Sequence, residues 1–501
     1  MENLSIGTSR ELGLVSADTT TTYDISEEFV LPDYVPEIRK LLCTKAQVLP
    51  ESRYVQGGKL ELGGTVTYLI IYTDDEGSLC GTTLSSSYET QIPFDEGQEG
   101  IDLTVVDNVN VRVNAQRRLT VKARLKTRLV GHKREQIQER IAPRSTADEM
   151  YLERDILNTE TFEICKCSLD NIRMSDTLES SDNQTTKPLW CDAFLVITDT
   201  KSQNGSVSAR GKVQVKCVCQ GNEGIVVLTK ELPLAEEIEC DECKAGDSVR
   251  VMGRCVSLSI SNETGEGSNK LFFDICCELE CEVLKKYPCS LTRDCYSTKY
   301  ETEAAYCDKE LYNVAKMGNT TFTLNEVIKQ KNGEIAEIVE KIATPVLEKA
   351  EIKGNKLILN GKITGAVIGK GQPKEDGSYE YVSQGMDVPF KYEYDLGKPI
   401  KEHVIRASVD IGNVTLSGDG EKINITAELY PAFTVYEKTR ERVLDSAVIK
   451  KDKEIKKDAS SVTAYFPKGS DTLWEIAKRF HTTVSKITED NESTDKTVLI
   501  V

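Results

Sequence analysis

The stretch GKLELGGTVTY, residues 58–68, decides the fold because its pattern returns twice along the chain. It opens on a glycine turn and continues into alternating apolar residues around a second glycine. This pattern is typical of a hairpin that leads into a strand with a bulge or a close backbone approach. The same arrangement recurs as GSVSARGKV at residues 205–213 and as GNKLILNGKI at residues 354–363. The sequence therefore predicts three copies of one β unit.

Two more features follow each copy in the same order. A proline with an apolar residue after it lies about 30 residues downstream, and an alternating strand comes later still. This order predicts all-β units of the sandwich or barrel type. We expect the three units at residues 20–147, 148–320 and 321–449. The proline steps are Pro93-Phe94, Pro233-Leu234 and Pro389-Phe390, and the strands cover 119–125, 271–279 and 423–429.

Three segments between the copies have apolar residues at helical spacing. They are residues 34–42, 147–157 and 324–349, and the last contains the sequence EIAEIVEKI. Such stripes predict a few helices that pack on a sheet or cap it. The expected fold class is thus mainly β, with a few helices between three related sandwich or barrel units.

Composition excludes several classes of function. A chain of 501 residues is too long for one hydrophobic core. Its net charge of −18 repels phosphate backbones, so no nucleic-acid partner is expected. With only 3 His, most acid–base chemistry near neutral pH is removed, and the sequence has no HExxH, GxSxG or P-loop pattern. We therefore expect a protein that is not an enzyme and needs no cofactor.

The start of the chain and its cysteines bear on its compartment. The opening MENLSIGTS lacks the basic and apolar regions of a secretory signal, and no run of apolar residues is long enough for a transmembrane segment. The expectation is a cytosolic protein whose thiols stay reduced. All cysteines except Cys43 and Cys80 lie between Cys165 and Cys307, and we expect them to fill the core as small apolar residues. CDEC at residues 240–243 is the one CxxC pair, and no metal site is expected.

A basic strand in the first unit departs from the overall acidity. Lys122, Arg124, Lys126 and Arg128 alternate with apolar residues, so all four cations lie on one face of the strand. The favoured interpretation is a solvated sheet face that protects an edge from aggregation. The alternative is a docking stripe for an acidic protein or an anionic membrane surface.

The last part of the chain predicts a small separate module. Residues 450–460 form a charged run that reads as a linker, and residues 461–501 follow it. A short alternating strand leads into the turn PKGSDT, residues 467–472, which ends in helix-capping residues. Apolar residues at helical spacing then predict two helices, and residues 497–501 a closing strand. The expected order is βααβ.

This module resembles a LysM domain, a family whose motif is a strand, a Gly-Asp-Thr-Leu-Trp turn into the first helix, and an asparagine after the second. The family binds N-acetylglucosamine polymers in a groove between the first turn and the loop after the second helix. Ser470 stands where the family usually has the glycine before the aspartate. Trp474 could be a core residue or a contact, and both interpretations stay open. Carried over, the groove would be formed by Gly469, Ser470, Asp471, Thr472, Leu473, Trp474, Asp490 and Asn491.

The three β units look like the spore-coat-assembly repeat (SPOCS, also DUF3794). This resemblance implies a non-enzymatic coat morphogenetic adaptor, made in the mother cell and placed at the forespore surface. It further implies that the LysM module binds a SpoIVA-type coat ATPase, with other coat proteins as further partners. The alternative is a protein that binds peptidoglycan or its N-acetylglucosamine precursors, and a wall hydrolase is the third class considered.

Overall fold

The computed structural model is almost entirely β. None of the helices in its described part is long and apolar enough to cross a membrane. The structure describes residues 2–3, 5–6, 9–94, 99–138, 141–142, 151–179, 187–221, 224–262, 270–330, 335–375, 377–419, 422–456, 463–469, 471–491 and 498–501.

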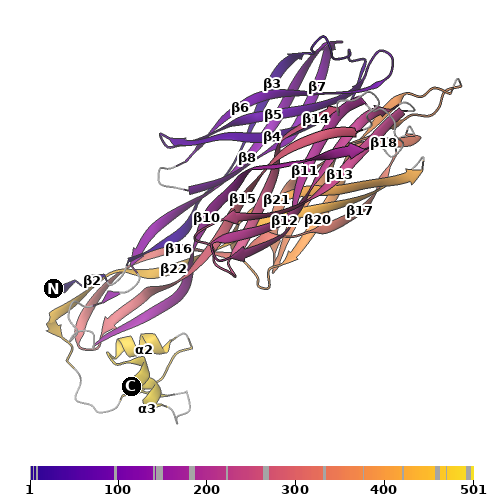
Figure 1. The fold of residues 1–501 in the computed structure, drawn as a ribbon. Coiled ribbons are helices and arrows are strands. Elements are labelled where there is room, and N and C mark those ends of the chain that lie inside the picture. Colours follow the sequence, from indigo (N-terminus) through magenta and orange to yellow (C-terminus); the bar gives the residue numbers. More distant parts are fainter. Residues whose placement is uncertain are drawn as a thin grey trace.

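The first β unit has six strands in two antiparallel sheets of three. The first strand of the unit pairs with the last, which also pairs with the fifth, and the second to fourth strands form a meander (Figure 1). The sheets are β3-β8-β7 and β4-β5-β6. The strands are β3 (Ser9–Val30), β4 (Lys40–Gln56), β5 (Lys59–Thr73), β6 (Leu79–Pro93), β7 (Glu99–Ala115) and β8 (Arg118–Gln138).

The second unit repeats this topology. Its sheets are β10-β15-β14 and β11-β12-β13, and apolar side chains and cysteines of both sheets share one core. The strands are β10 (Leu152–Glu179), β11 (Lys187–Gln203), β12 (Ser206–Gly221), β13 (Gly224–Glu239), β14 (Ser248–Asn262) and β15 (Lys270–Ser297).

The third unit repeats the topology with its first strand divided in two. Both pieces, β16 (Tyr300–Asn319) and β17 (Phe322–Lys329), pair with β22 (Lys422–Glu454), which also pairs with β21 (Glu402–Asp419). The strand pairing therefore places residues 300–319 with the third unit, and β22 continues into the first part of the expected 450–460 linker. The second sheet is β18 (Glu337–Lys353), β19 (Lys356–Lys370) and β20 (Tyr381–Asp395). The expectation of three related sandwich units is confirmed.

Short strands at the N-terminus tie the first and third units together. β1 (Glu2–Asn3) pairs with β22, and β2 (Ser5–Ile6) pairs with β9 (Ile141–Ala142). The start of the chain thus joins a sheet of the third unit.

The repeated second glycine has a direct structural reason. A Cβ at Gly64 would lie 2.3 Å from the carbonyl oxygen of Leu49, and one at Gly211 would lie 2.1 Å from that of Val196. Gly361 meets the neighbouring strand in the same way. In each unit a register shift in that strand adjoins the contact. The bulge and close approach predicted from the sequence are therefore present three times.

The prediction of helices between the copies is wrong for the residues that the structure describes. Residues 147–150 of that prediction lie outside the description, whereas Lys40–Leu42 and Leu152–Leu157 are in strands. EIAEIVEKI runs into β18, whose pairing with β19 begins at Glu337. A Thr-Pro step at Pro345 opposes a helix there, and β-branched Ile and Val suit a strand. Cross-strand pairing outweighs the helical spacing.

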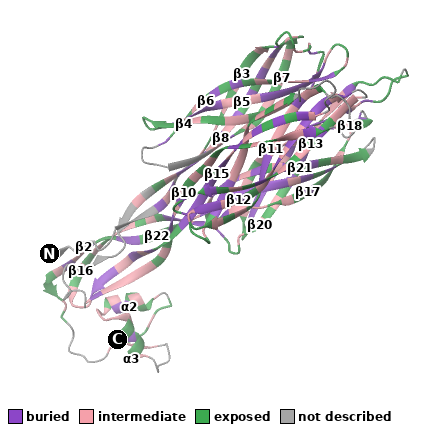
Figure 2. Cartoon of the chain, viewed as in Figure 1, coloured by how far each residue is buried: buried purple, intermediate pink, exposed green. Residues whose placement is uncertain are grey.

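The three units pack against one another along their length. Val130 of the first unit, Phe162 of the second and Tyr436 of the third belong to one buried apolar cluster. Side chains of opposite charge also link each pair of units. Lys45 pairs with Asp192 at 2.5 Å, Lys216 with Glu340 at 2.9 Å, and Lys309 with Glu135. Buried residues accordingly continue through the middle of the molecule (Figure 2). The units form one body.

A buried ion cluster lies where the second and third units meet. Arg250 is 0% exposed, and its guanidinium forms an ion pair of 3.7 Å with the carboxylate of Glu282. Arg406 of the third unit donates a hydrogen bond to the same carboxylate. Burial alone would raise the pKa of Glu282, but the two guanidinium groups hold it below its usual value. Next to this cluster, His132 of the first unit bonds the Tyr436 hydroxyl at 2.9 Å, and burial lowers the pKa of His132 to about 4.

Replacing Glu282 should destabilise the whole body. The Glu282→Ala change leaves two buried guanidinium groups without their anion, so we expect the free energy of unfolding in urea to fall by about 3–5 kcal/mol. Glu280→Ala removes the exposed partner of Arg254 from the same strand and should cost at most about 1 kcal/mol. Equal losses for the two variants would contradict the importance of the cluster.

Candidate functional site

The C-terminal module has the expected βααβ order. Its strands β23 (Ala464–Tyr465) and β24 (Leu499–Ile500) pair, and helices α2 (Leu473–Arg479) and α3 (Val484–Asp490) lie between them. Thr472 caps α2 in a capping box with Glu475, and the Thr483 side chain caps α3. Buried Ile476, Ala477 and Ile487 form the small core.

Two of the predicted groove residues shape the loops. Asp471 accepts hydrogen bonds from the Tyr465 hydroxyl at 2.7 Å and from the Lys468 backbone at 2.9 Å, and these donors lower its pKa. Asn491 bonds the backbone of Ile500 in both directions, at 2.8 and 2.7 Å. These side chains fix the turn before α2 and the chain after α3, where the groove of the family lies.

The exposed part of this predicted site lies around the first turn. Gly469 and Thr472 are exposed there, and the Leu473 side chain is 42% exposed, whereas Asp490 is exposed at the end of α3. Ser470 lies outside the described residues. Phe466 is 70% exposed beside this turn, a position that the sequence pattern assigned only to a strand. In the sequence, only the proline that follows Phe466 indicated that the strand ends before this residue and that its side chain could face outward.

Trp474 lies against the β units of its own chain. Its indole N–H donates a hydrogen bond of 2.8 Å to the Asp294 carboxylate at the end of β15. Its ring lies 5.0 Å from that of Tyr296, edge to face, and the Tyr296 hydroxyl donates to the Thr482 carbonyl at 2.7 Å. Trp474 therefore packs against the small core of the module and also contacts the β units of the same chain.

Asp294 is the centre of this junction. Lys478 bonds both of its carboxylate oxygens at 2.7 Å, and the Tyr306 hydroxyl donates at 2.6 Å. Burial would raise the pKa of Asp294, but these donors and the Trp474 indole hold it below its ordinary value. We call Asp294, Tyr296, Tyr306, Trp474 and Lys478 the Asp294 junction.

The basic strand is β8, and part of its charge is neutralised. Arg124 forms a hydrogen-bonded pair with Asp24 at 2.8 Å, and Arg128 forms one with Asp18 at 3.0 Å, both aspartates being on the adjacent strand β3. Lys122 is exposed and Lys126 half-buried on the same face. The Asp partners on β3 fit a solvated sheet face better than a docking stripe, but the expected protection of an edge is wrong, because β8 lies between β3 and β7.

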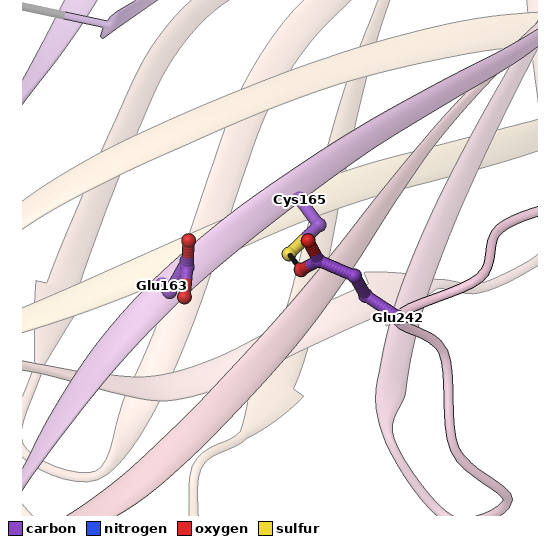
Figure 3. A group of neighbouring side chains, drawn as sticks. All are labelled: Glu163, Cys165 and Glu242. Atoms are coloured by element: carbon purple, nitrogen blue, oxygen red, sulfur yellow. Dashed lines mark hydrogen bonds between the residues drawn. The ribbon is translucent and has the colours of Figure 1, made fainter.

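One group in the described part of the chain has metal-ligand atoms in mutual reach. The ligand atoms of Glu163, Cys165 and Glu242 lie within 4.8 Å of one another (Figure 3). The Cys165 thiol donates to Glu242 at 2.9 Å, and burial with this carboxylate raises the pKa of Cys165 to about 12. Cys165 and Glu242 are thus paired with each other, and the Tyr287 hydroxyl donates to Glu163 at 3.4 Å, so the group is held together by hydrogen bonds.

The comparisons with known proteins identify one part of the chain. Residues 468–501 match the LysM domain family. No curated protein matches the chain. No solved structure matches it either. The C-terminal module is thus a LysM domain, as its residues indicated, and a LysM domain supports a role in binding peptidoglycan or in protein interaction.

The Asp294 junction predicts that one substitution releases the LysM domain without unfolding it. Asp294→Ala leaves Lys478 and the Trp474 indole without their acceptor and should cost about 3 kcal/mol of docking free energy. Only 2 Trp are present, and Trp190 is buried elsewhere, so exposure of Trp474 should shift the fluorescence emission to the red. The control Asp155→Ala removes the ion-pair partner of Arg293, the residue before Asp294 on β15. This variant should leave the emission unchanged.

The same junction should depend on pH. The pKa of Asp294 is lowered in the docked state. Its contribution to the free energy of docking is therefore complete above the ordinary pKa of 3.8 and is lost as the pH falls through the lowered pKa. The red shift of wild-type emission should therefore appear only in this acid range. A red shift that begins near pH 6 would contradict the assignment.

Proposed function

Because its C-terminal module is a LysM domain, we propose that this chain is a coat morphogenetic adaptor of the SipL type. In this proposal it binds a SpoIVA-type coat ATPase through the LysM domain and helps to attach the coat around the forespore. It acts in the cytoplasm of the mother cell, at the forespore surface, without catalysing a reaction. The three β units are the spore-coat-assembly repeats of the proposal and supply the scaffold.

The observation that supports it best is the way the LysM domain is mounted. Trp474 and Lys478 both donate hydrogen bonds to Asp294, so this side of α2 faces the β units of the same chain. Leu473 and Phe466 remain exposed around the first turn. A large apolar side chain that enters a pocket of a partner supplies much of the binding energy of an interface. The mounting therefore favours a protein ligand for the free side of the domain.

The second candidate is binding of peptidoglycan or its N-acetylglucosamine precursors. It is favoured by the family match itself, which covers the turn before α2 and the end of the chain. Asp471 and Asn491 hold the two loops in place, as a backbone-lined groove for a sugar would require. A wall hydrolase, the third class, has no support from the described residues beyond the abundance of carboxylates.

A charge placed on the exposed turn should separate docking from folding. Leu473→Glu should weaken binding to a SpoIVA-type ATPase at least about tenfold, since an unpaired charge would have to enter the interface. Ser485→Glu adds the same charge at an exposed position of α3 and should bind as the wild type does. Both affinities can be measured by surface plasmon resonance with the full chain. Equal affinities for Leu473→Glu and the wild type would refute docking through this turn.

Sedimentation with purified wall polymer decides between the two candidates. The adaptor proposal expects the full chain to stay in the supernatant. Sedimentation that is lost with Leu473→Glu and kept with Ser485→Glu would establish the glycan candidate instead. Loss of turbidity of a wall suspension, abolished by neutralising a single carboxylate, would point to a hydrolase.

A further inference from the structure

The cysteines of the second unit lie opposite one another across its strands. Cys191 of β11 is directly opposite Cys217 of β12, and Cys255 of β14 is directly opposite Cys277 of β15. Directly opposite residues in antiparallel strands have Cα atoms about 4.5–5.5 Å apart, a range that disulfides use. A third pair, Cys167 and Cys281, has the same relation between β10 and β15.

The side chains of the first two pairs already point toward each other. The Sγ atoms lie 3.0 Å apart for Cys191 and Cys217, and 3.8 Å apart for Cys255 and Cys277. Cys219 also lies near Cys217, at 3.4 Å, but it is two positions along the same strand. The directly opposite thiol is thus the nearer one, and a covalent bond requires little movement of the backbone.

Each of these two pairs combines a half-buried thiol with a buried one. Cys191 and Cys255 are the half-buried members, whereas Cys217 and Cys277 are buried. Cys191 and Cys255 both line a single cavity of about 440 Å³ between the first and second units. Lys45 and Leu69 of the first unit line its other side. A molecule that enters this cavity therefore lies next to one cysteine of each pair.

The groups around the cavity oppose ionisation of the Cys255 thiol. The hydrogen bond with Cys277, burial and the Asp192 carboxylate all raise the pKa of Cys255, and the ammonium group of Lys45 offsets them only in part. The hydrogen bond with Cys191 likewise raises the pKa of Cys217. These thiols stay protonated near neutral pH, so the reaction should be slow there and faster in alkali.

We propose that this cavity is a thiol–disulfide exchange site, at which a low-molecular-weight disulfide oxidises Cys191–Cys217 and Cys255–Cys277 to two cross-strand disulfides. This modification would covalently join β11 to β12 and β14 to β15, one link in each sheet of the second unit. It concerns the scaffold and is independent of the partner of the LysM domain. It requires a more oxidising setting than the cytoplasm, where these thiols stay reduced.

The exchange has two steps at each pair. The thiolate of Cys191, its proton having passed to solvent, attacks one sulfur of the small disulfide and expels the other sulfur as a thiolate, which takes up a proton. The thiolate of Cys217 then attacks the Cys191 sulfur and expels the second half of the small molecule in the same way. Two cysteine thiols are oxidised, and one small disulfide is reduced to two thiols. Cys255 and Cys277 react likewise.

The test uses the full reduced chain and 2-hydroxyethyl disulfide as the probe, at pH 8.5. After alkylation of the remaining thiols, non-reducing peptide mapping by mass spectrometry should find Cys191 joined to Cys217 and Cys255 joined to Cys277. The rate of closure should rise from pH 7 to pH 9, because the thiolate is the attacking species. Cys191 and Cys255 that stay reduced, or that keep the probe as a lasting mixed disulfide, would overturn the proposal.

Single substitutions provide matched controls. Cys191→Ala should abolish the first linkage and leave the second, and Cys255→Ala should do the reverse. Cys276→Ala removes another half-buried thiol, opposite Arg173 and Ser257 rather than another cysteine, and should keep both linkages. If a variant fails to fold by circular dichroism, the wild-type map alone decides. Loss of both linkages in Cys276→Ala with a native spectrum would contradict the assigned pairs.

Discussion

The ion cluster of Arg250, Glu282 and Arg406 is the constraint on which the rest of the structure depends. Two guanidinium groups and one carboxylate are buried at the boundary of the second and third units, and His132 of the first unit lies beside them. Buried charges are costly unless they face each other in a fitting geometry, so few packings of the three units are compatible with this cluster. The ion pairs between the units act in the same direction.

A single strand carries this constraint to the functional module. β15 contains Cys277 in the sandwich core, Glu282 in the ion cluster, and Asp294 and Tyr296 at the junction with the LysM domain. The position of the LysM domain is thus set by the same strand that fixes the packing of the units. The domain is held by one side of α2, and its first turn remains open for a ligand. We regard this mounting as the main structural support for an adaptor role.

Some of this could be predicted from the sequence. The repeated second glycine indicated a bulge and a close approach, because only a residue without a Cβ fits there, and Gly64 and Gly211 confirm it. The LysM motif is local and was equally readable. The helical stripe around Ile338 misled because pairing with β19, which lies far along the chain, decides its conformation. The partner of Trp474 was hidden for the same reason, since Asp294 lies 180 residues away.

The central claim is that the LysM domain is held in one place on the β units. Hydrogen–deuterium exchange of the full chain and of a chain ending at residue 460 tests it most directly. The account predicts faster exchange in the shorter chain around residues 293–306, with unchanged exchange in the three sandwich cores. Identical exchange around residues 293–306 in both chains would contradict the account.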